Sequence, residues 1–145
     1  MVIELSFRKA KAVSDRYQNS LVLAADTLVY GTTVLGKPET PAMAHDMLVS
    51  LSGNWHSVYT GLTLIHTGTG RVISKAEMTR VHFVELSERE IDDYLATNEP
   101  MDKAGAYGIQ GIGGMFIDRI EGSYSNVVGL PMATLRNMLK EIMSV

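Results

Sequence analysis

The stretch Leu21–Gly36, LVLAADTLVYGTTVLG, constrains the fold more than any other part of the sequence. Its first five residues form an unbroken apolar run, too short for a lone helix, and such a run predicts a strand buried on both faces. A single acid, Asp26, ends the run, and a carboxylate beside so much apolar surface needs a cation, a metal or hydrogen-bond donors. Lys37, which follows two turn-forming glycines, is one candidate cation. The stretch therefore has the features of an active site.

Composition narrows the class of protein. A chain of 145 residues, 46% hydrophobic and 20% charged, fits one domain with a real core. The formal net charge of −3 argues against a general nucleic-acid binder, although converging lysines can still hold a small anion. The sequence contains no cysteine, which excludes disulfides, thiolate metal sites and a cysteine nucleophile. Because the sequence has no signal peptide and no long apolar run, we expect a cytoplasmic protein.

Before the apolar run, residues 2–17 predict an amphipathic helix. Its expected buried stripe consists of Ile3, Phe7, Ala10 and Tyr17. Lys9 lies in an apolar row of this helix, so its stem should be covered and its head directed, unless the side chain simply reaches solvent.

After the apolar run, Thr40 and Pro41 predict the start of a second helix, as its N-cap and first residue. Residues 57–66 and 71–86 are rich in β-branched side chains and predict a hairpin closed by a four-residue loop, 67–70. Ser87 and Glu90 match a capping box.

The last part of the chain is rich in glycine. Short strands are possible at 115–120 and 124–128, and Pro131 predicts the start of a final helix.

The segment Gly31–Lys37, GTTVLGK, matches seven positions of a phosphate-binding P-loop. Pro38 replaces the hydroxyl residue that follows and disfavours the helix that a P-loop requires at its lysine. We therefore reject a P-loop. Lys37 remains either a fixed charge for an anion or an ordinary turn lysine.

A second glycine-rich segment, Pro100–Gly114, can expose backbone N–H groups to a ligand. Lys103 adds a charge, and the amide of Gln110 can read a base edge that presents one donor and one acceptor. A tight-turn segment without a ligand is the alternative. The four histidines lack metal-ligand spacing, and the pattern favours a structural role for His56 over a place in a cleft.

Together these motifs closely resemble the Maf family of nucleoside triphosphate pyrophosphatases. The matching segments run through nearly the whole chain in family order: Lys9-Ala10, Ala25-Asp26-Thr27, Gly36-Lys37-Pro38, Leu51-Ser52-Gly53, Asp102–Gly111 and Gly122-Ser123-Tyr124. The resemblance implies an α/β fold of the inosine-triphosphatase-like kind, an elongated mixed β-sheet flanked by helices, with two lobes and a central cleft. It also implies one Maf-like domain over residues 1–145, truncated at its amino terminus relative to the family.

The activity that the resemblance implies is hydrolysis of dTTP or UTP to the monophosphate and pyrophosphate, assisted by Mg²⁺ or Mn²⁺. Modified pyrimidine nucleotides are a further option. Asp26 matches the family's proton acceptor and is the expected metal ligand, while Lys9 and Lys37 match phosphate-site lysines. The expected substrate-binding residues are Thr27, Gln110 and Lys103.

Two other readings stay open because the family's Ser- and Arg-rich amino-terminal loop is absent from this sequence. One is a nucleotide-binding remnant without catalysis. The other is a regulatory protein linked to inhibition of septum formation. The resemblance leads us to expect a homodimer. The net charge and the lack of a long apolar run lead us to expect no nucleic-acid polymer or membrane as partner.

Overall fold

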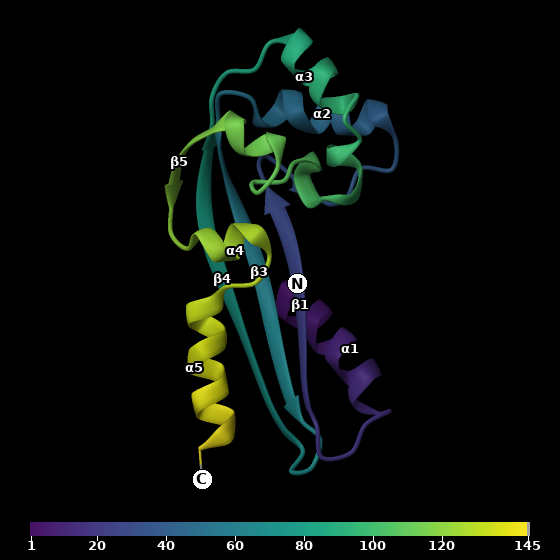
Figure 1. Ribbon diagram of the computed structural model, residues 1–145, viewed down its shortest axis with the longest axis vertical. Coiled ribbons are helices and arrows are strands. Elements are labelled where there is room, and N and C mark those ends of the chain that lie inside the picture. The colour runs from purple at the N-terminus through teal and green to yellow at the C-terminus, as the bar shows by residue number, and fades with distance from the viewer. Residues whose placement is uncertain (145) are drawn as a thin grey trace. The chain divides into compact units, whose positions relative to one another are not determined.

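The computed structural model describes residues 1–144 (Figure 1). Its α-helices are α1 (Val2–Ser14), α2 (Pro41–Leu51), α3 (Glu88–Leu95), α4 (Tyr124–Val128) and α5 (Met132–Met143). Its strands are β1 (Leu21–Tyr30), β2 (Val34–Leu35), β3 (Trp55–His66), β4 (Arg71–Phe83) and β5 (Ile117–Glu121). Short 3₁₀ helices, η1 (Glu99–Asp102), η2 (Ala104–Ala106) and η3 (Ile112–Phe116), lie between α3 and β5.

Within residues 1–144 the strands form a five-stranded sheet in the order β2-β1-β3-β4-β5. The pairs β1–β2 and β4–β5 are antiparallel, with Val29 opposite Leu35 and Val81 opposite Ile120. Strands β3 and β4 follow one another through residues 67–70, which confirms the predicted hairpin. The predicted α/β class, with helices flanking a β-sheet, is confirmed as well. No helix in this part of the chain is both long and apolar enough to cross a membrane.

The chain divides into two compact units. Unit 1 comprises Met1–Thr27, Tyr59–Glu77 and the chain from Ser125 onward, and unit 2 comprises Leu28–Val58 and Met78–Tyr124. Strands β1, β3 and β4 contribute residues to both units. A single Maf-like domain over residues 1–145 stays a prediction.

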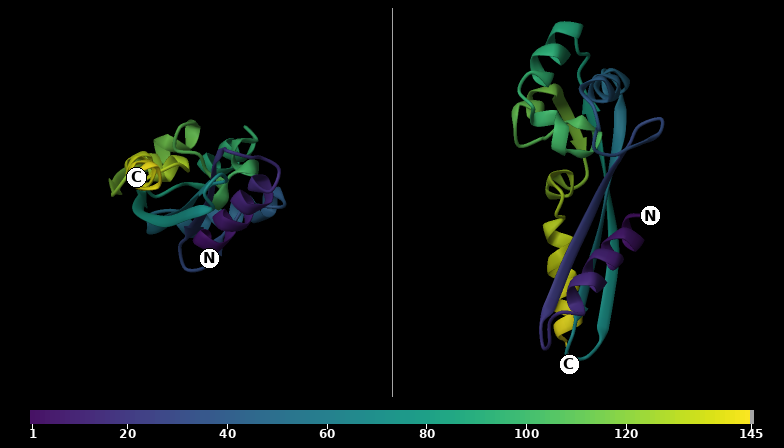
Figure 2. Two further views of the ribbon diagram at one scale, coloured as in Figure 1. Left: turned by 90° about the horizontal axis from the view of Figure 1, so that it is seen from below. Right: turned by 90° about the vertical axis from the view of Figure 1, so that its right-hand side faces the viewer.

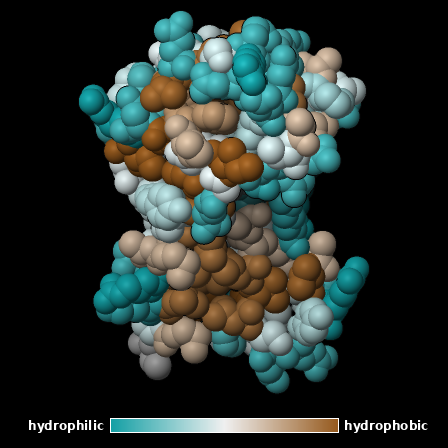
Figure 3. All heavy atoms as spheres, turned by 45° about the horizontal axis from the view of Figure 1, so that its top comes forward, coloured by the Kyte–Doolittle hydropathy of each residue, from teal (hydrophilic) through white to brown (hydrophobic). Residues whose placement is uncertain are grey.

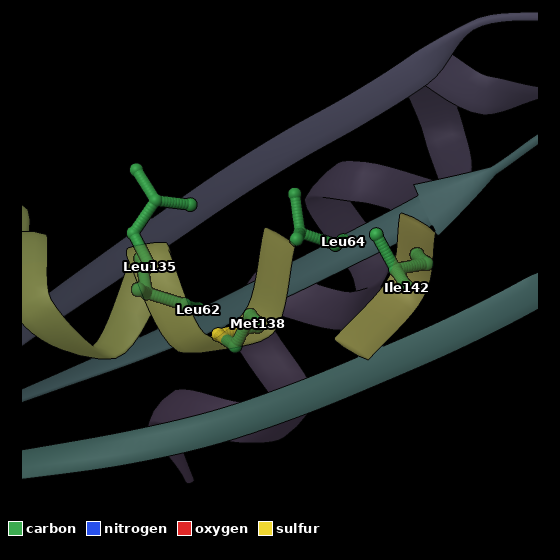
Figure 4. Packing of buried hydrophobic residues seen from close by; sticks show 5 residues of the cluster. All are labelled: Leu62, Leu64, Leu135, Met138 and Ile142. Atoms are coloured by element: carbon green, nitrogen blue, oxygen red, sulfur yellow. The ribbon is translucent and has the colours of Figure 1, made fainter. Parts of the chain in front are cut away.

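In unit 1, α1 and α5 pack on opposite faces of β3, and Figure 2 shows both helices beside the strands. Thr63 of β3 bonds to α1, whereas the neighbouring Leu62 and Leu64 contact α5. This arrangement follows from the alternation of strand side chains. The cluster beneath α5 consists of Leu62, Leu64, Leu135, Met138 and Ile142 (Figure 4).

The buried face of α1 differs from the prediction. Its buried residues are Val2, Ser6, Ala10 and Ser14. Ile3, Phe7 and Tyr17, which the pattern placed inside, are 42%, 38% and 57% exposed. The helix approaches β3 so closely that a Cβ added at Gly61 would overlap the backbone carbonyl group of Val2. Such a short separation admits small side chains and excludes large ones.

Buried hydroxyl groups connect α1 to the sheet. The Ser6 Oγ donates to the carbonyl oxygen of Ile3 at 2.9 Å and therefore accepts from Thr63, whose Oγ1 lies 2.8 Å away. Thr63 in turn accepts from Ser74 at 2.8 Å. Each hydroxyl group in this series of hydrogen bonds has an acceptor for its hydrogen. The hydroxyl groups can therefore be buried without the penalty of an unmade hydrogen bond.

Strand β1 is also less buried than predicted. Val22 is 8% exposed and packs with Ala10, but Leu21 and Leu23 on the other side are 39% and 41% exposed. The start of the strand therefore has one covered side and one open side, and the prediction of burial on both faces was wrong. Large apolar side chains reach the surface elsewhere too, and Figure 3 shows hydrophobic residues, in brown, on the face in view.

Local capping signals were predicted well. The Thr40 side chain accepts from the Met43 amide at 3.1 Å and caps α2. Ser87 and Glu90 form the predicted capping box of α3, with both hydrogen bonds at 3.1 Å. These contacts involve residues three apart in the chain, so the sequence alone contains the whole signal.

The prediction of a strand at 124–128 was wrong, because these residues form α4. The amides of Gly129 and Leu130 donate back to the Ser125 carbonyl at 3.2 and 3.1 Å and close a helical turn. The valines at the end of this segment favour a strand on propensity alone, but the turn at Gly129, whose φ is 118°, ends the segment as a helix instead.

The close contact between α1 and β3 can be tested with Gly61→Ala. The added methyl group must displace the backbone at Val2, so we expect a loss of roughly 1–3 kcal/mol in the free energy of unfolding, as overpacked cores show. Urea unfolding would measure it. Gly36→Ala is the matched control, because a Cβ at Gly36 meets no atom of the described chain within 4 Å. Equal unfolding midpoints for the two variants would contradict the close packing.

Candidate active site

Asp26 and Lys9 form an ion pair in unit 1. The Lys9 Nζ contacts the Asp26 Oδ1 and also donates to the carbonyl oxygen of Ala25 at 3.4 Å. The Asp26 side chain is 15% exposed, whereas the Lys9 side chain is 57% exposed. Ala10, the residue after Lys9, is fully buried and holds this turn of α1 against the sheet. Lys9 thus has the directed head that its position predicted, and it supplies the cation that Asp26 required.

Thr27 follows Asp26 and belongs to a short chain of hydroxyl groups. Its Oγ1 lies 2.9 Å from the Thr60 Oγ1, and Thr60 donates to the carbonyl oxygen of Asn126 at 3.3 Å. Since Thr60 has a single hydroxyl hydrogen, Thr27 must be the donor in the first of these bonds. Its own hydrogen is committed, so Thr27 can offer a ligand only its acceptor lone pairs.

Lys103 pairs with Asp102 in unit 2, and the charge of Lys37 also acts on that carboxylate. The Lys103 Nζ donates to the Asp102 Oδ1 at 2.9 Å, and this hydrogen bond lowers the pKa of Asp102, with Lys37 contributing in the same direction. The backbone also links their two segments, because the Gly105 amide donates to the Gly36 carbonyl at 3.1 Å. This end of unit 2 therefore carries two lysines and one carboxylate.

Gln110 is exposed in the turn between η2 and η3. The Gly111 amide donates to the Gly108 carbonyl at 3.2 Å, so the backbone around Gln110 is a tight turn, as one of the two sequence interpretations held. The turn also leaves the Gln110 side chain accessible, as the other interpretation required.

His56 is buried, as the structural role favoured by the sequence requires, but its Nδ1 has no hydrogen-bond partner among residues 1–144. It is 3% exposed, and its Nε2 lies 2.6 Å from the hydroxyl group of Tyr107. Burial lowers the pKa of His56 to about 4, and the nearby His82 acts in the same direction. His56 is therefore neutral at physiological pH.

Within residues 1–144 the one cluster of three candidate metal ligands is His45, Glu88 and Asp92, on α2 and α3 of unit 2. This cluster does not include Asp26. The His45 Nε2 lies 2.8 Å from the Glu88 Oε2, so this cluster already contains a hydrogen bond. Asp26 supplies a single carboxylate. Mg²⁺ is usually bound by one or two carboxylates together with substrate phosphates, and Asp26 fits that mode.

Two residues position the candidates. Thr60, which matches the family pattern but was given no role from the sequence, orients Thr27. Glu99, which the sequence did not single out, bonds to the backbone beside Gln110. Both roles depend on partners far away in the sequence, so no local pattern contains them.

The chain thus has a lysine-paired carboxylate at the end of an apolar strand segment. It also has a lysine beside a glycine-rich turn. These groups are suited to a phosphorylated ligand. The chain belongs to the Maf-like protein family, whose family model matches residues 1–142.

Curated relatives are similar over most of their length. The dTTP/UTP pyrophosphatase of Bacillus cytotoxicus is 49% identical over 142 residues, covering 97% of this chain and 73% of the relative. The protein of the same name from a Geobacillus strain is 50% identical over 139 residues, covering 95% and 74%. That of Clostridium perfringens is 50% identical over 141 residues, covering 96% and 73%.

The burial of His56 predicts a pH dependence of stability. In the unfolded chain His56 takes up a proton near pH 6.5, whereas in the folded chain it does so near pH 4. Its contribution is therefore complete above about pH 6.5 and is lost as the pH falls toward 4, up to about 3 kcal/mol. Chemical unfolding across this range should show a smaller pH slope for His56→Gln than for the unchanged chain. The same slope in both would contradict the assignment.

Proposed function

We propose that this chain is a nucleoside triphosphate pyrophosphatase that hydrolyses UTP and dTTP to the monophosphate and pyrophosphate. The observation that carries the proposal is the Lys9–Asp26 pair, which holds a largely buried carboxylate at the end of an apolar strand segment. The names of the relatives, at about half identity over most of the chain, support the choice of substrate. The homodimer and the cytoplasmic location remain predictions from the sequence.

Asp26 has the chemistry of a general base. Its Oδ1 contacts Lys9, which leaves the second carboxylate oxygen to accept a hydrogen bond from the water that attacks the α-phosphorus. Proton transfer to Asp26 makes that water a nucleophile, and the bond between the α-phosphorus and the bridging oxygen breaks to release pyrophosphate. Mg²⁺ or Mn²⁺, when held by Asp26 and the phosphates, would supply positive charge that stabilises the transition state.

The lysines supply charge from the protein itself. Because the Lys9 side chain is more than half exposed, its ammonium group can reach a bound phosphate while it still orients Asp26. We assign Lys37 and Lys103 to further phosphate contacts, since both are held near Asp102 by their own segments. Negative charge develops on the leaving pyrophosphate, and fixed cations stabilise that charge.

Base selection is assigned to Thr27 and Gln110. The Gln110 amide offers one acceptor and two donors, which suits the O4 and N3–H edge shared by uracil and thymine. Thr27 can add an acceptor, because its hydrogen is committed to Thr60. A base with a different edge would leave polar groups unpaired and would be rejected.

Replacing Asp26 tests its role. Asp26→Asn keeps the size of the side chain but removes the base, so pyrophosphate release from UTP should fall by about 10²–10⁴-fold, as the loss of general-base catalysis predicts. Asp15 is an exposed acid at the C-cap of α1 in the same unit, and Asp15→Asn should leave the rate unchanged. Full activity of Asp26→Asn would contradict the role. Stabilisation of the unchanged chain by UTP without turnover would favour the non-catalytic nucleotide-binding alternative.

Two lysines on one helix provide a second, matched test. Lys9→Met removes the cation beside Asp26, and a charge-assisted contact is worth roughly 1.5–3 kcal/mol, so kcat/KM for UTP should fall by about 10–150-fold. Lys11→Met breaks a solvent-exposed pair with Asp15, at 3.2 Å, and should have little effect. Similar kinetics for the two variants would show that Lys9 has no special role.

A further inference from the structure

Glu99, at the start of η1, is a half-buried anchor for the glycine loop, which we define as Gly108–Gly114. Its Oε1 accepts from the Ile112 amide at 2.9 Å, and its Oε2 accepts from the Gly113 amide at 3.0 Å. The hydroxyl group of Tyr94 also donates to the Oε2 of Glu99. One carboxylate thus satisfies two backbone N–H groups of the same loop.

The other end of the glycine loop is fastened through Tyr94. The Gly108 amide donates to the Tyr94 hydroxyl oxygen at 3.2 Å, and that hydroxyl group donates to Glu99. The ring of Tyr94 is itself fixed by an edge-to-face contact with Phe116, at 4.9 Å between centroids. Both ends of the loop are therefore tied to the Tyr94–Glu99 pair, and Gln110 lies between the two attachment points.

The glycines of the loop make this attachment possible. A Cβ added at Gly111 would overlap the Glu99 carboxylate, and one added at Gly113 would lie 2.6 Å from the Tyr94 hydroxyl oxygen. Any other residue at these positions would require the loop or the Tyr94–Glu99 pair to move. The glycine-rich composition of this segment thus has a specific steric cause.

Glu99 is held as an anion. Burial raises its pKa, but the hydrogen bonds from Tyr94, Gly113 and Ile112, together with the charge of Lys103, outweigh burial, and the pKa lies below its ordinary value. An ionised carboxylate makes stronger hydrogen bonds to backbone N–H groups than a neutral acceptor does. The loop is consequently held by charge-assisted bonds.

We infer that Glu99 is a positioning residue for base selection: by fixing both ends of the glycine loop, directly and through Tyr94, it holds the Gln110 amide in the orientation that reads the pyrimidine edge. This inference rests on the proposed function, in which Gln110 reads that edge. Glu99 itself acts only through the loop. A binding group held by a rigid support discriminates better than one on a mobile turn, because the wrong ligand cannot be accommodated by movement.

The test measures kcat/KM for UTP and for CTP with the full chain and with Glu99→Gln and Glu99→Ala. The Gln variant keeps the size of the side chain but loses its charge and one acceptor oxygen. Its effect therefore reports the lost hydrogen bonds to the loop, without the empty space that the Ala variant also leaves. The unchanged chain should prefer UTP, and both variants should lose at least about tenfold of that preference, equivalent to one lost hydrogen bond. The loss should come mainly from a higher KM for UTP.

Two controls separate positioning from general damage. Glu85→Ala, at an exposed acid of unit 2, should change neither the stability nor the preference. In a Gln110→Ala background, Glu99→Ala should cause no further loss of preference, because both act on the same contact.

Two results would overturn the inference. One is that Glu99→Ala prefers UTP as strongly as the unchanged chain does. The other is that Glu99→Ala lowers the preference as much in the Gln110→Ala background as it does alone. Turnover of neither nucleotide by the unchanged chain would contradict the proposed function, and base selection by Glu99 with it. Amide hydrogen exchange at Ile112 and Gly113, faster in Glu99→Gln than in the unchanged chain, would report the anchoring of the loop separately.

Discussion

The close approach of α1 to β3 is the constraint on which the arrangement of unit 1 depends. Gly61 has no side chain, and α1 presents Ser6 and Ala10 to the strand, so the two backbones nearly touch. The helix is then fixed along its axis by the hydroxyl chain from Ser74 through Thr63 to Ser6. Lys9, one residue before Ala10, is carried by this packing to the carboxylate of Asp26. The close contact between α1 and β3, made by small residues, thus holds Lys9 in place beside Asp26.

In unit 2, side chains fix a backbone that has no regular secondary structure. Turns and 3₁₀ helices leave N–H groups without partners in regular structure, and buried donors must find acceptors. Glu99 and Tyr94 provide them for the glycine loop. A single carboxylate can accept hydrogen bonds from several backbone N–H groups. It therefore takes the place of the carbonyl groups that a neighbouring strand would offer. The resulting turn carries Gln110 at its surface, where a ligand can meet it.

Features set by neighbours in the chain could be predicted from the sequence, such as the cap at Thr40, the capping box at Ser87 and the β3–β4 hairpin. Asp26 could be singled out because one acid after an apolar run is costly without a partner. Features set by tertiary contacts could not be predicted. The apolar stripe of α1 suggested that Phe7 was buried, but the space between α1 and β3 depends on Gly61, more than fifty residues away. The role of Glu99 depends on the folded path of the glycine loop and has no local signature.

The most direct test of the central claim is the fate of the oxygen atom when this chain hydrolyses UTP in water labelled with oxygen-18, with Mg²⁺ present. Attack at the α-phosphorus puts the label in UMP and leaves the pyrophosphate unlabelled, and phosphorus NMR resolves both products. We expect labelled UMP and unlabelled pyrophosphate in equal amounts. Formation of UDP and inorganic phosphate, or label in the pyrophosphate, would contradict it, because the water would then have attacked a different phosphorus atom.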